Sequence, residues 1–156
     1  MSKLKIYLAQ INTIVGDLEG NSNLIREYTG KAAAAGAHIV LCPEMVITGY
    51  PVEDLALRKT FRSASINAIN KVASDIKTDG FGEILVCAGF LDESENGKPQ
   101  NALALIYQGA VVAKYIKHHL PNYGVFDEYR NFTSGQKSLV VRFAGVDIGV
   151  AICEDI

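Results

Sequence analysis

Glu44, Lys117 and Cys153 each follow a run of apolar and β-branched residues that is typical of a buried strand. In open α/β structures ligands gather beyond the carboxyl ends of strands, so these three groups can converge on one pocket. There the Cys153 thiolate would attack an amide or nitrile carbon, and Glu44 would accept the thiol proton and later pass it to departing ammonia. The Lys117 ammonium would favour the thiolate and, with the backbone N–H of Glu154, would stabilise the oxyanion of the tetrahedral intermediate.

Each of the three residues also has an ordinary structural interpretation. A cysteine at a strand end is more often a small core residue than a nucleophile, and Glu44 and Lys117 can be a solvated loop acid and a surface lysine. Taken singly, these interpretations are the favoured ones. The combination of three reactive groups at three strand ends favours a catalytic site.

The order of these residues along the chain resembles the nitrilase, or carbon–nitrogen hydrolase, superfamily, whose catalytic residues are Glu, Lys and Cys in that order. Three longer motifs are similar to the glutaminase domains of glutamine-dependent NAD synthetases: residues 15–21 (VGDLEGN), 43–51 (PEMVITGYP) and 117–128 (KHHLPNYGVFDE). The resemblance covers nearly the whole chain, and the motif at 117–128 is the part specific to that branch.

The resemblance implies that Glu44 is the base, Lys117 the oxyanion-stabilising cation, and Cys153 the nucleophile that becomes a glutamyl thioester. Glutamine is the implied substrate, and its ammonia would serve ATP-dependent synthesis of NAD from its deamido precursor. A stand-alone amidase or nitrilase acting on another amide is the alternative within the same superfamily. A non-catalytic fragment that keeps only the fold is the alternative outside it.

Three further residues enter the substrate site by the same resemblance. Tyr123 would line the glutamine site, Glu128 would be the second glutamate beside the lysine, and Glu154 would border the substrate next to the nucleophile. Tyr123 could instead be a core aromatic with a satisfied hydroxyl, and Glu128 could instead pair with Arg130 or another nearby cation.

The resemblance also bears on the extent of the domain. In the superfamily the hydrolase domain continues beyond the nucleophile, and in the synthetase branch an ATP-dependent domain follows, whereas this sequence ends three residues after Cys153. We therefore expect residues 1–156 to be the N-terminal part of a glutaminase domain, with the synthetase domain absent. No cofactor is expected for this chain, since ATP and magnesium would belong to the absent domain.

The order of elements, helix-rich first and strand-rich later, predicts an α/β or α+β class. The resemblance implies a four-layer α-β-β-α sandwich that stops after the nucleophile strand. A polar loop is expected at 92–99, and a long irregular segment at 118–137. We expect helices at residues 17–36 and 53–77, and strands at 5–10, 38–42, 83–91, 101–107, 110–117, 139–143 and 146–152.

Charge and cysteine content narrow the class of protein. The formal charge of −2, from 15 basic and 17 acidic residues, gives no footprint for nucleic acid or an anionic membrane. Three scattered cysteines form no disulfide framework and suit a reducing compartment. With no signal peptide and no membrane-spanning run expected, we predict a cytoplasmic protein.

A metal site and the partners complete the expectations. His118 and His119 lie near Cys153 in the predicted site, but adjacent histidines on an extended segment point to opposite faces and rarely bind one metal, so no metal is expected. A synthetase domain in the intact protein and further copies of the chain in a homo-oligomer are the expected partners.

Overall fold

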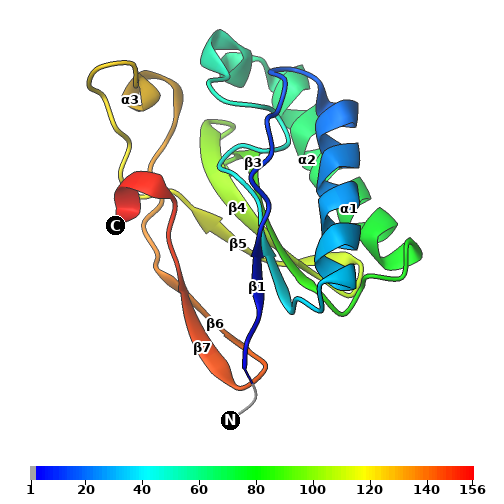
Figure 1. The fold of residues 1–156 in the computed structure, drawn as a ribbon. Helices are drawn as coiled ribbons and strands as arrows, with labels where there is room; N and C mark the ends of the chain where they lie inside the picture. Colours follow the sequence, from blue (N-terminus) through cyan, green and yellow to red (C-terminus); the bar gives the residue numbers. More distant parts are fainter. Residues whose placement is uncertain (1–2) are drawn as a thin grey trace.

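The structure, a computed structural model, describes residues 3–156. A five-stranded sheet in the order β1-β2-β3-β4-β5 forms its centre (Figure 1). β1, β2 and β3 are parallel, and β4 and β5 continue the sheet as antiparallel strands. The strands are β1 Ile6–Leu8, β2 Ile39–Leu41, β3 Leu85–Glu93, β4 Pro99–Tyr107 and β5 Ala110–Ile116.

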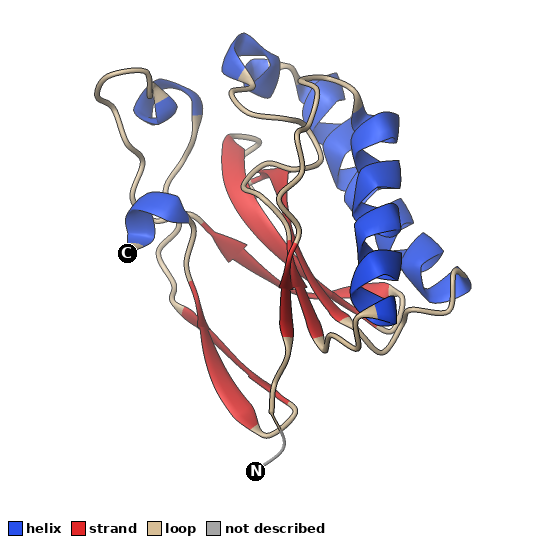
Figure 2. Ribbon diagram, in the orientation of Figure 1, coloured by secondary structure: helices blue, strands red, loops and turns tan. Residues whose placement is uncertain are grey.

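Two long helices, α1 Leu18–Ala34 and α2 Lys59–Thr78, cover one face of this sheet (Figure 2). The Asp17 carboxylate accepts a hydrogen bond from the backbone N–H of Gly20 at the start of α1, which satisfies one of the free donors of the first turn. On α2, Ile69, Val72 and Ile76 recur at helical spacing and are about 1% exposed each. They form part of an apolar core with the sheet.

A separate hairpin, β6 Leu139–Phe143 and β7 Val146–Val150, covers the opposite face of the sheet. Its side chains Val141, Phe143 and Ile148 pack against sheet residues that include Leu85 and Leu105. The alternation of apolar and polar residues in the hairpin explains this packing, because successive strand residues point to opposite faces. Residues 3–156 thus form three layers, helices, sheet and hairpin, and the predicted mixed α/β class is confirmed.

The predicted helix at 53–77 is wrong at its start. Residues Glu53–Leu57 form a 3₁₀ turn, η1, and Arg58 is extended before α2 begins. The buried Arg62 guanidinium donates to the carbonyl of Ala56 at 3.0 Å. In a continuous helix that carbonyl would accept from the backbone N–H four residues later, so Arg62 competes with the helical bond.

Two predicted irregular segments are more ordered than expected. The predicted polar loop at 92–99 is a shorter turn in the structure, because β3 continues through Asp92. The buried carboxylate of Asp92 forms an ion pair of 2.5 Å with Nζ of Lys114, a residue of β5. The segment 118–137 contains a one-turn helix, α3 Glu128–Asn131.

Among residues 3–156, no helix has both the length and the apolar character needed to cross a membrane.

Candidate active site

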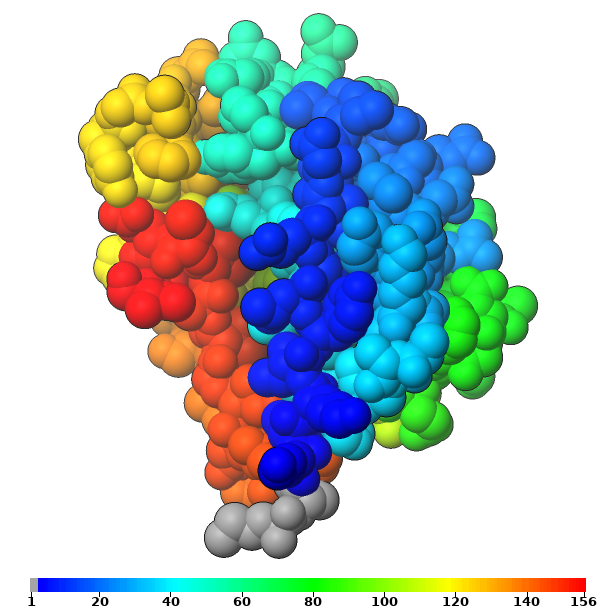
Figure 3. Space-filling model, in the orientation of Figure 1, coloured from blue at the N-terminus to red at the C-terminus, as the bar shows by residue number. Residues whose placement is uncertain are grey.

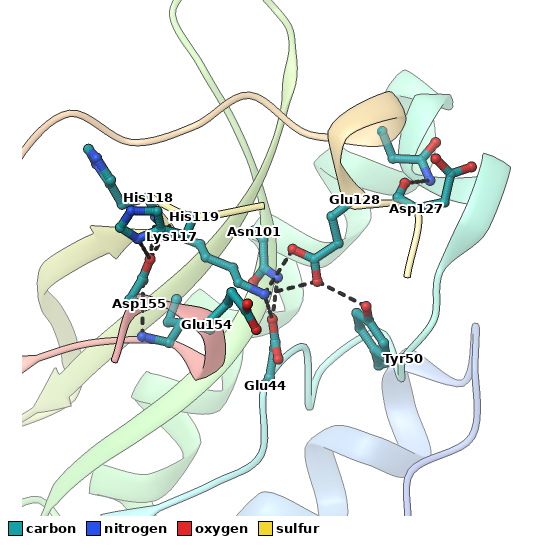
Figure 4. A network of polar contacts seen from close by, with 12 residues as sticks. Glu44, Tyr50, Asn101, Lys117, His118, His119, Asp127, Glu128, Glu154 and Asp155 are labelled. Carbon is teal, nitrogen blue, oxygen red and sulfur yellow. Dashed lines mark hydrogen bonds and ion pairs between the residues drawn. The ribbon is translucent and has the colours of Figure 1, made fainter. Parts of the chain in front are cut away.

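Lys117, Glu44 and Glu128 meet in a buried polar cluster (Figure 4). The Lys117 ammonium donates to Glu44 Oε1 at 2.6 Å and to Glu128 Oε1 at 3.0 Å. Lys117 follows β5 directly, Glu44 lies in the loop after β2, and Glu128 is the first residue of α3. Lys117 is only 1% exposed, so the surface-lysine interpretation is wrong.

The backbone brings Glu44 to this place through a close approach to the sheet. The segment 43–45 crosses β3 at Gly89, where a Cβ would collide with the backbone nitrogen of Met45. Met45 itself has a φ of 53°, in the left-handed region that residues other than glycine seldom adopt. The absence of a side chain at Gly89 therefore lets the loop lie on the sheet and direct Glu44 toward Lys117.

A similar device fixes Lys117. The backbone N–H of Lys117 donates to the carbonyl of Asn101 at 2.9 Å, and its own carbonyl accepts from Gly135 at 2.8 Å. A Cβ on Gly135 would collide with the carbonyl oxygen of Ile116. The end of β5 is thus held on both sides by backbone bonds.

The predicted strand at 146–152 ends two residues early, because β7 stops at Val150, and Cys153 begins the 3₁₀ turn η2, Cys153–Asp155. Its φ of 48° is again in the left-handed region. Such strained residues persist where the surrounding structure over-determines them, and they cluster at active sites. Cys153 is exposed, whereas Cys42 is half-buried and Cys87 is buried, so the core interpretation of Cys153 is wrong.

The electrostatic environment of Cys153 differs from the expectation in one respect. Burial and the negative charge of Glu44 raise the pKa of the Cys153 thiol, although Lys117 and the backbone N–H of Glu154 act to lower it. The predicted favouring of the thiolate by Lys117 is therefore present but outweighed. Glu44 is close enough to the thiol for its charge to raise the thiol pKa, which places a carboxylate where a base would be needed.

The charges of the cluster are one ammonium and two carboxylates. Burial would lower the pKa of Lys117, but hydrogen bonds to Glu128 and Glu44 outweigh it and raise that pKa, so the ammonium stays charged. Burial also raises the pKa of Glu128. The negative charge of Glu44 adds to the effect of burial on Glu128, whereas Lys117 and the Tyr50 hydroxyl act against it.

Two contributors to the cluster were not predicted. Tyr50 donates its hydroxyl to Glu128 Oε1 at 2.9 Å, and the Asn101 amide donates to Glu44 Oε1 at 2.7 Å. Tyr50 belongs to the motif at 43–51, which was the available signal. Asn101 lies near the start of β4, beside Gln100, and belongs to none of the three motifs.

The predicted substrate-site residue Tyr123 lies beside η2, the turn that carries Cys153. Its hydroxyl donates to Glu154 Oε1 and Oε2 at 3.0 and 2.9 Å. Tyr123 is 58% exposed, so the core-aromatic interpretation is wrong. Figure 3 shows the C-terminal turn at the surface against the segment that carries Tyr123.

Glu128 does not pair with Arg130. The Arg130 guanidinium instead contacts Asp127, Asp54 and Glu53 at the surface. Glu128 faces inward to Lys117, with a side chain that is 3% exposed. Arg130 is therefore not the partner of Glu128, and the nearby cation that pairs with Glu128 is Lys117.

The two histidines lie side by side, contrary to expectation. Their ring centroids are 4.8 Å apart. The expectation that the two side chains point to opposite faces of an extended segment is wrong, because β5 ends at Ile116. Beyond that residue, the backbone N–H groups of His118 and His119 both donate to the Asp155 carboxylate. Within residues 3–156, no group of three or more His, Cys, Asp or Glu side chains could hold a metal ion.

One large groove does not coincide with the polar cluster. It has a volume of about 670 Å³ and lies between α1 and α2, where Arg26 and Lys71 on its walls pair with Asp75. These are exposed ion pairs with ordinary structural roles. The residues predicted to be reactive lie instead in the polar cluster and at the adjoining cysteine.

The chain is similar to known proteins in both sequence and fold. A family model described as carbon-nitrogen hydrolase matches residues 5–156. The chain is 39% identical to the glutamine-dependent NAD(+) synthetase of Thermotoga maritima over 156 residues, which are 100% of this chain and 26% of that protein. The chain spans about a quarter of the length of the curated relatives it matches.

Solved structures share the fold. The glutamine-dependent NAD+ synthetase from Acinetobacter baumannii, in complex with ADP, matches with a TM-score of 0.85 and 34% identity over 97% of this chain and 28% of that chain. An amidase from Nesterenkonia sp. matches with a TM-score of 0.80 and 22% identity over 97% of this chain and 56% of that chain. The second match shows the fold alone.

Proposed function

Because the chain belongs to the carbon–nitrogen hydrolase family, we propose that it hydrolyses the side-chain amide of glutamine through a thioester on Cys153. The observation that carries the proposal is the buried Lys117 ammonium, which lies within hydrogen-bonding distance of Glu44 and Glu128. A buried ion cluster is costly to the fold, so a chemical role for it is the economical explanation.

The first step is nucleophilic attack. Glu44 takes the proton of the Cys153 thiol, and Sγ forms a bond to the amide carbon as its C=O π electrons move to oxygen. Lys117 and the backbone N–H of Glu154 stabilise the resulting oxyanion, a type of contribution typically worth about 3–4 kcal/mol for each donor. Because the pKa of the thiol is raised, this step depends on the base.

The second and third steps release the products. Glu44 returns the proton to the nitrogen as the C–N bond breaks, so ammonia leaves and a glutamyl thioester remains on Cys153. Glu44 then activates a water molecule, which attacks the thioester and frees glutamate and the thiol. Tyr123 and Glu154, joined by their hydrogen bond, border the substrate in this proposal.

The resemblance to NAD synthetases extends the proposal to the longer protein. We propose that ammonia passes to an ATP-dependent synthetase domain that amidates the deamido precursor of NAD in the cytoplasm, within a homo-oligomer. The fourth layer of the hydrolase sandwich would cover the outer face of the β6–β7 hairpin, where Val140 is 65% exposed. We assign neither ATP nor magnesium to residues 3–156.

Ammonia release from glutamine, asparagine, a simple aliphatic amide and a nitrile tests the proposal. We expect turnover of glutamine above the other three, and none with Cys153→Ala. Turnover of another amide in preference to glutamine would support the alternative of a general amidase. A folded chain that releases no ammonia from any of them would contradict the proposal.

A further inference from the structure

The Asp155 carboxylate is almost fully enclosed by hydrogen-bond donors, although it lies in the exposed nucleophile turn. Oδ1 accepts from the backbone N–H groups of His118 at 3.0 Å and His119 at 2.7 Å. Oδ2 accepts from the Tyr115 hydroxyl at 2.8 Å and from the backbone N–H of Ile152 at 3.1 Å. Its side chain is 3% exposed, and Figure 4 shows it directed toward the two histidines.

These four donors belong to two segments that the chemistry must hold together. Ile152 directly precedes the nucleophile Cys153, and His118 directly follows the cation Lys117. One carboxylate is therefore bonded to the backbone one residue away from each reacting group. The turn Cys153–Asp155 is also joined to the segment after β5 by the hydrogen bond from Tyr123 to Glu154, which lies at the surface.

The charge of the Asp155 carboxylate suits a role in holding these two segments together. Burial alone would raise the pKa of its carboxyl, but the hydrogen bonds from the His119 backbone, Tyr115, Ile152 and the His118 backbone outweigh burial and lower that pKa. The carboxylate is thus charged at neutral pH, and charge-assisted hydrogen bonds are the stronger ones. They also supply the external restraint that the left-handed backbone of Cys153 requires.

We propose that Asp155 is a positioning residue that sets Cys153 against Lys117 and Glu44 by fastening the nucleophile turn to the end of β5. The proposal rests on the proposed function for its effect on turnover, but its geometric content concerns the Cys153 thiol alone. A displacement of about 1 Å at a reacting group can lower a rate roughly a hundredfold.

The test compares Asp155→Ala and Tyr115→Phe with the control Asp147→Asn. Asp147 pairs with Arg142 on the exposed hairpin and contacts none of the donors described above. One measurement is kcat and KM for ammonia release from glutamine. The other is the rate at which iodoacetamide alkylates Cys153 as a function of pH, followed by peptide mass mapping.

For Asp155→Ala we expect kcat to fall roughly a hundredfold with a smaller change in KM. The midpoint of the alkylation profile should fall toward the ordinary thiol value, because the thiol moves away from the negative charge of Glu44. Tyr115→Phe removes one of the four donors and should shift both quantities in the same directions by less. Asp147→Asn should match the wild type in both.

A folded Asp155→Ala variant with an unchanged alkylation midpoint and a kcat within about threefold of wild type would overturn the proposal. If Asp155→Ala does not fold, Asp155→Asn decides by the same criteria, since its amide keeps one acceptor and loses the other. If the wild-type chain releases no ammonia, the proposed function fails, but the alkylation midpoints still decide whether Asp155 positions the thiol.

Discussion

The helix-covered core and the polar cluster at the end of β5 are built on opposite principles. The core joins α1, α2 and the sheet through apolar side chains such as Ile25, Val40 and Ile69, which are about 1% exposed or less. The cluster encloses Lys117 and Glu128 at nearly the same depth. Apolar burial stabilises a fold directly, whereas buried ions offset their own desolvation only if every partner is present.

Backbone conformation differs between the two regions in the same sense. α1 and α2 are regular helices, while Met45 and Cys153, beside and within the cluster, have positive φ values. The core therefore tolerates small changes that leave it apolar, but the cluster depends on a complete set of contacts. This contrast agrees with the chemical role proposed for the cluster.

The largest expected effect comes from removing the central cation. Lys117→Met would leave Glu128 and Glu44 without their ion-pair partner, and we expect the free energy of unfolding in urea to fall by about 3–5 kcal/mol. Ammonia release should be lost as well. The control Lys71→Met removes an exposed lysine of α2 and should change stability by less than about 0.5 kcal/mol. Equal stability of the two variants would contradict the contrast drawn here.

A smaller effect is expected where the cluster touches the sheet. Gly89→Ala would drive a Cβ against the backbone of Met45, and we expect the free energy of unfolding to fall by about 1–3 kcal/mol. Turnover should decline with it because Glu44 must move. Gly149→Ala is the matched control, since nothing lies within 4 Å of its new Cβ. Indistinguishable urea midpoints would refute the close approach.

A change confined to the core should separate stability from chemistry. Ile69→Val removes one methylene from a fully packed position on α2, and the free energy of unfolding should fall by about 0.5–1.5 kcal/mol. The pH profile of Cys153 alkylation should stay unchanged, because Ile69 belongs to the apolar core and not to the polar cluster. A shifted profile would show that the two regions are coupled.

The smallest expected effect is a shift in the pKa of the Cys153 thiol. Glu44 opposes the Cys153 thiolate and raises the thiol pKa, so Glu44→Gln should lower the midpoint of the alkylation profile. The thiolate would then exist at lower pH, yet turnover should be lost because the base is absent. The exposed Glu83→Gln change should leave the midpoint unchanged. A rise of the midpoint in Glu44→Gln would contradict the conclusion that Glu44 raises the thiol pKa.

Most of the core was predictable from sequence, because helical spacing of apolar residues reports which face of a helix is buried. The boundary of α2 was not, since Arg62 competes for the Ala56 carbonyl through a contact that periodicity does not encode. Asp92 was assigned to a loop because its charge suggested exposure. Its partner Lys114 lies 22 residues away on another strand.

In the cluster, strand ends and residue chemistry predicted Glu44, Lys117 and Cys153, and resemblance added Glu128. The contacts that support these residues could not be predicted from the sequence. Tyr50 meets Glu128 across 78 residues of sequence, and Asp155 binds backbone N–H groups, which carry no residue type to recognise. The net direction of the Cys153 thiol pKa also required the geometry, because burial and two opposite charges act on it together.

The most direct test of the central claim is a covalent trap of Cys153. We would measure the intact mass and the peptide map of the chain after exposure to an electrophilic analogue of glutamine, with Cys153→Ala alongside. The account predicts one adduct, located on Cys153, suppressed by excess glutamine and missing from the variant. An adduct on Cys42 or Cys87, an adduct that persists in Cys153→Ala, or no adduct on the folded chain would contradict it.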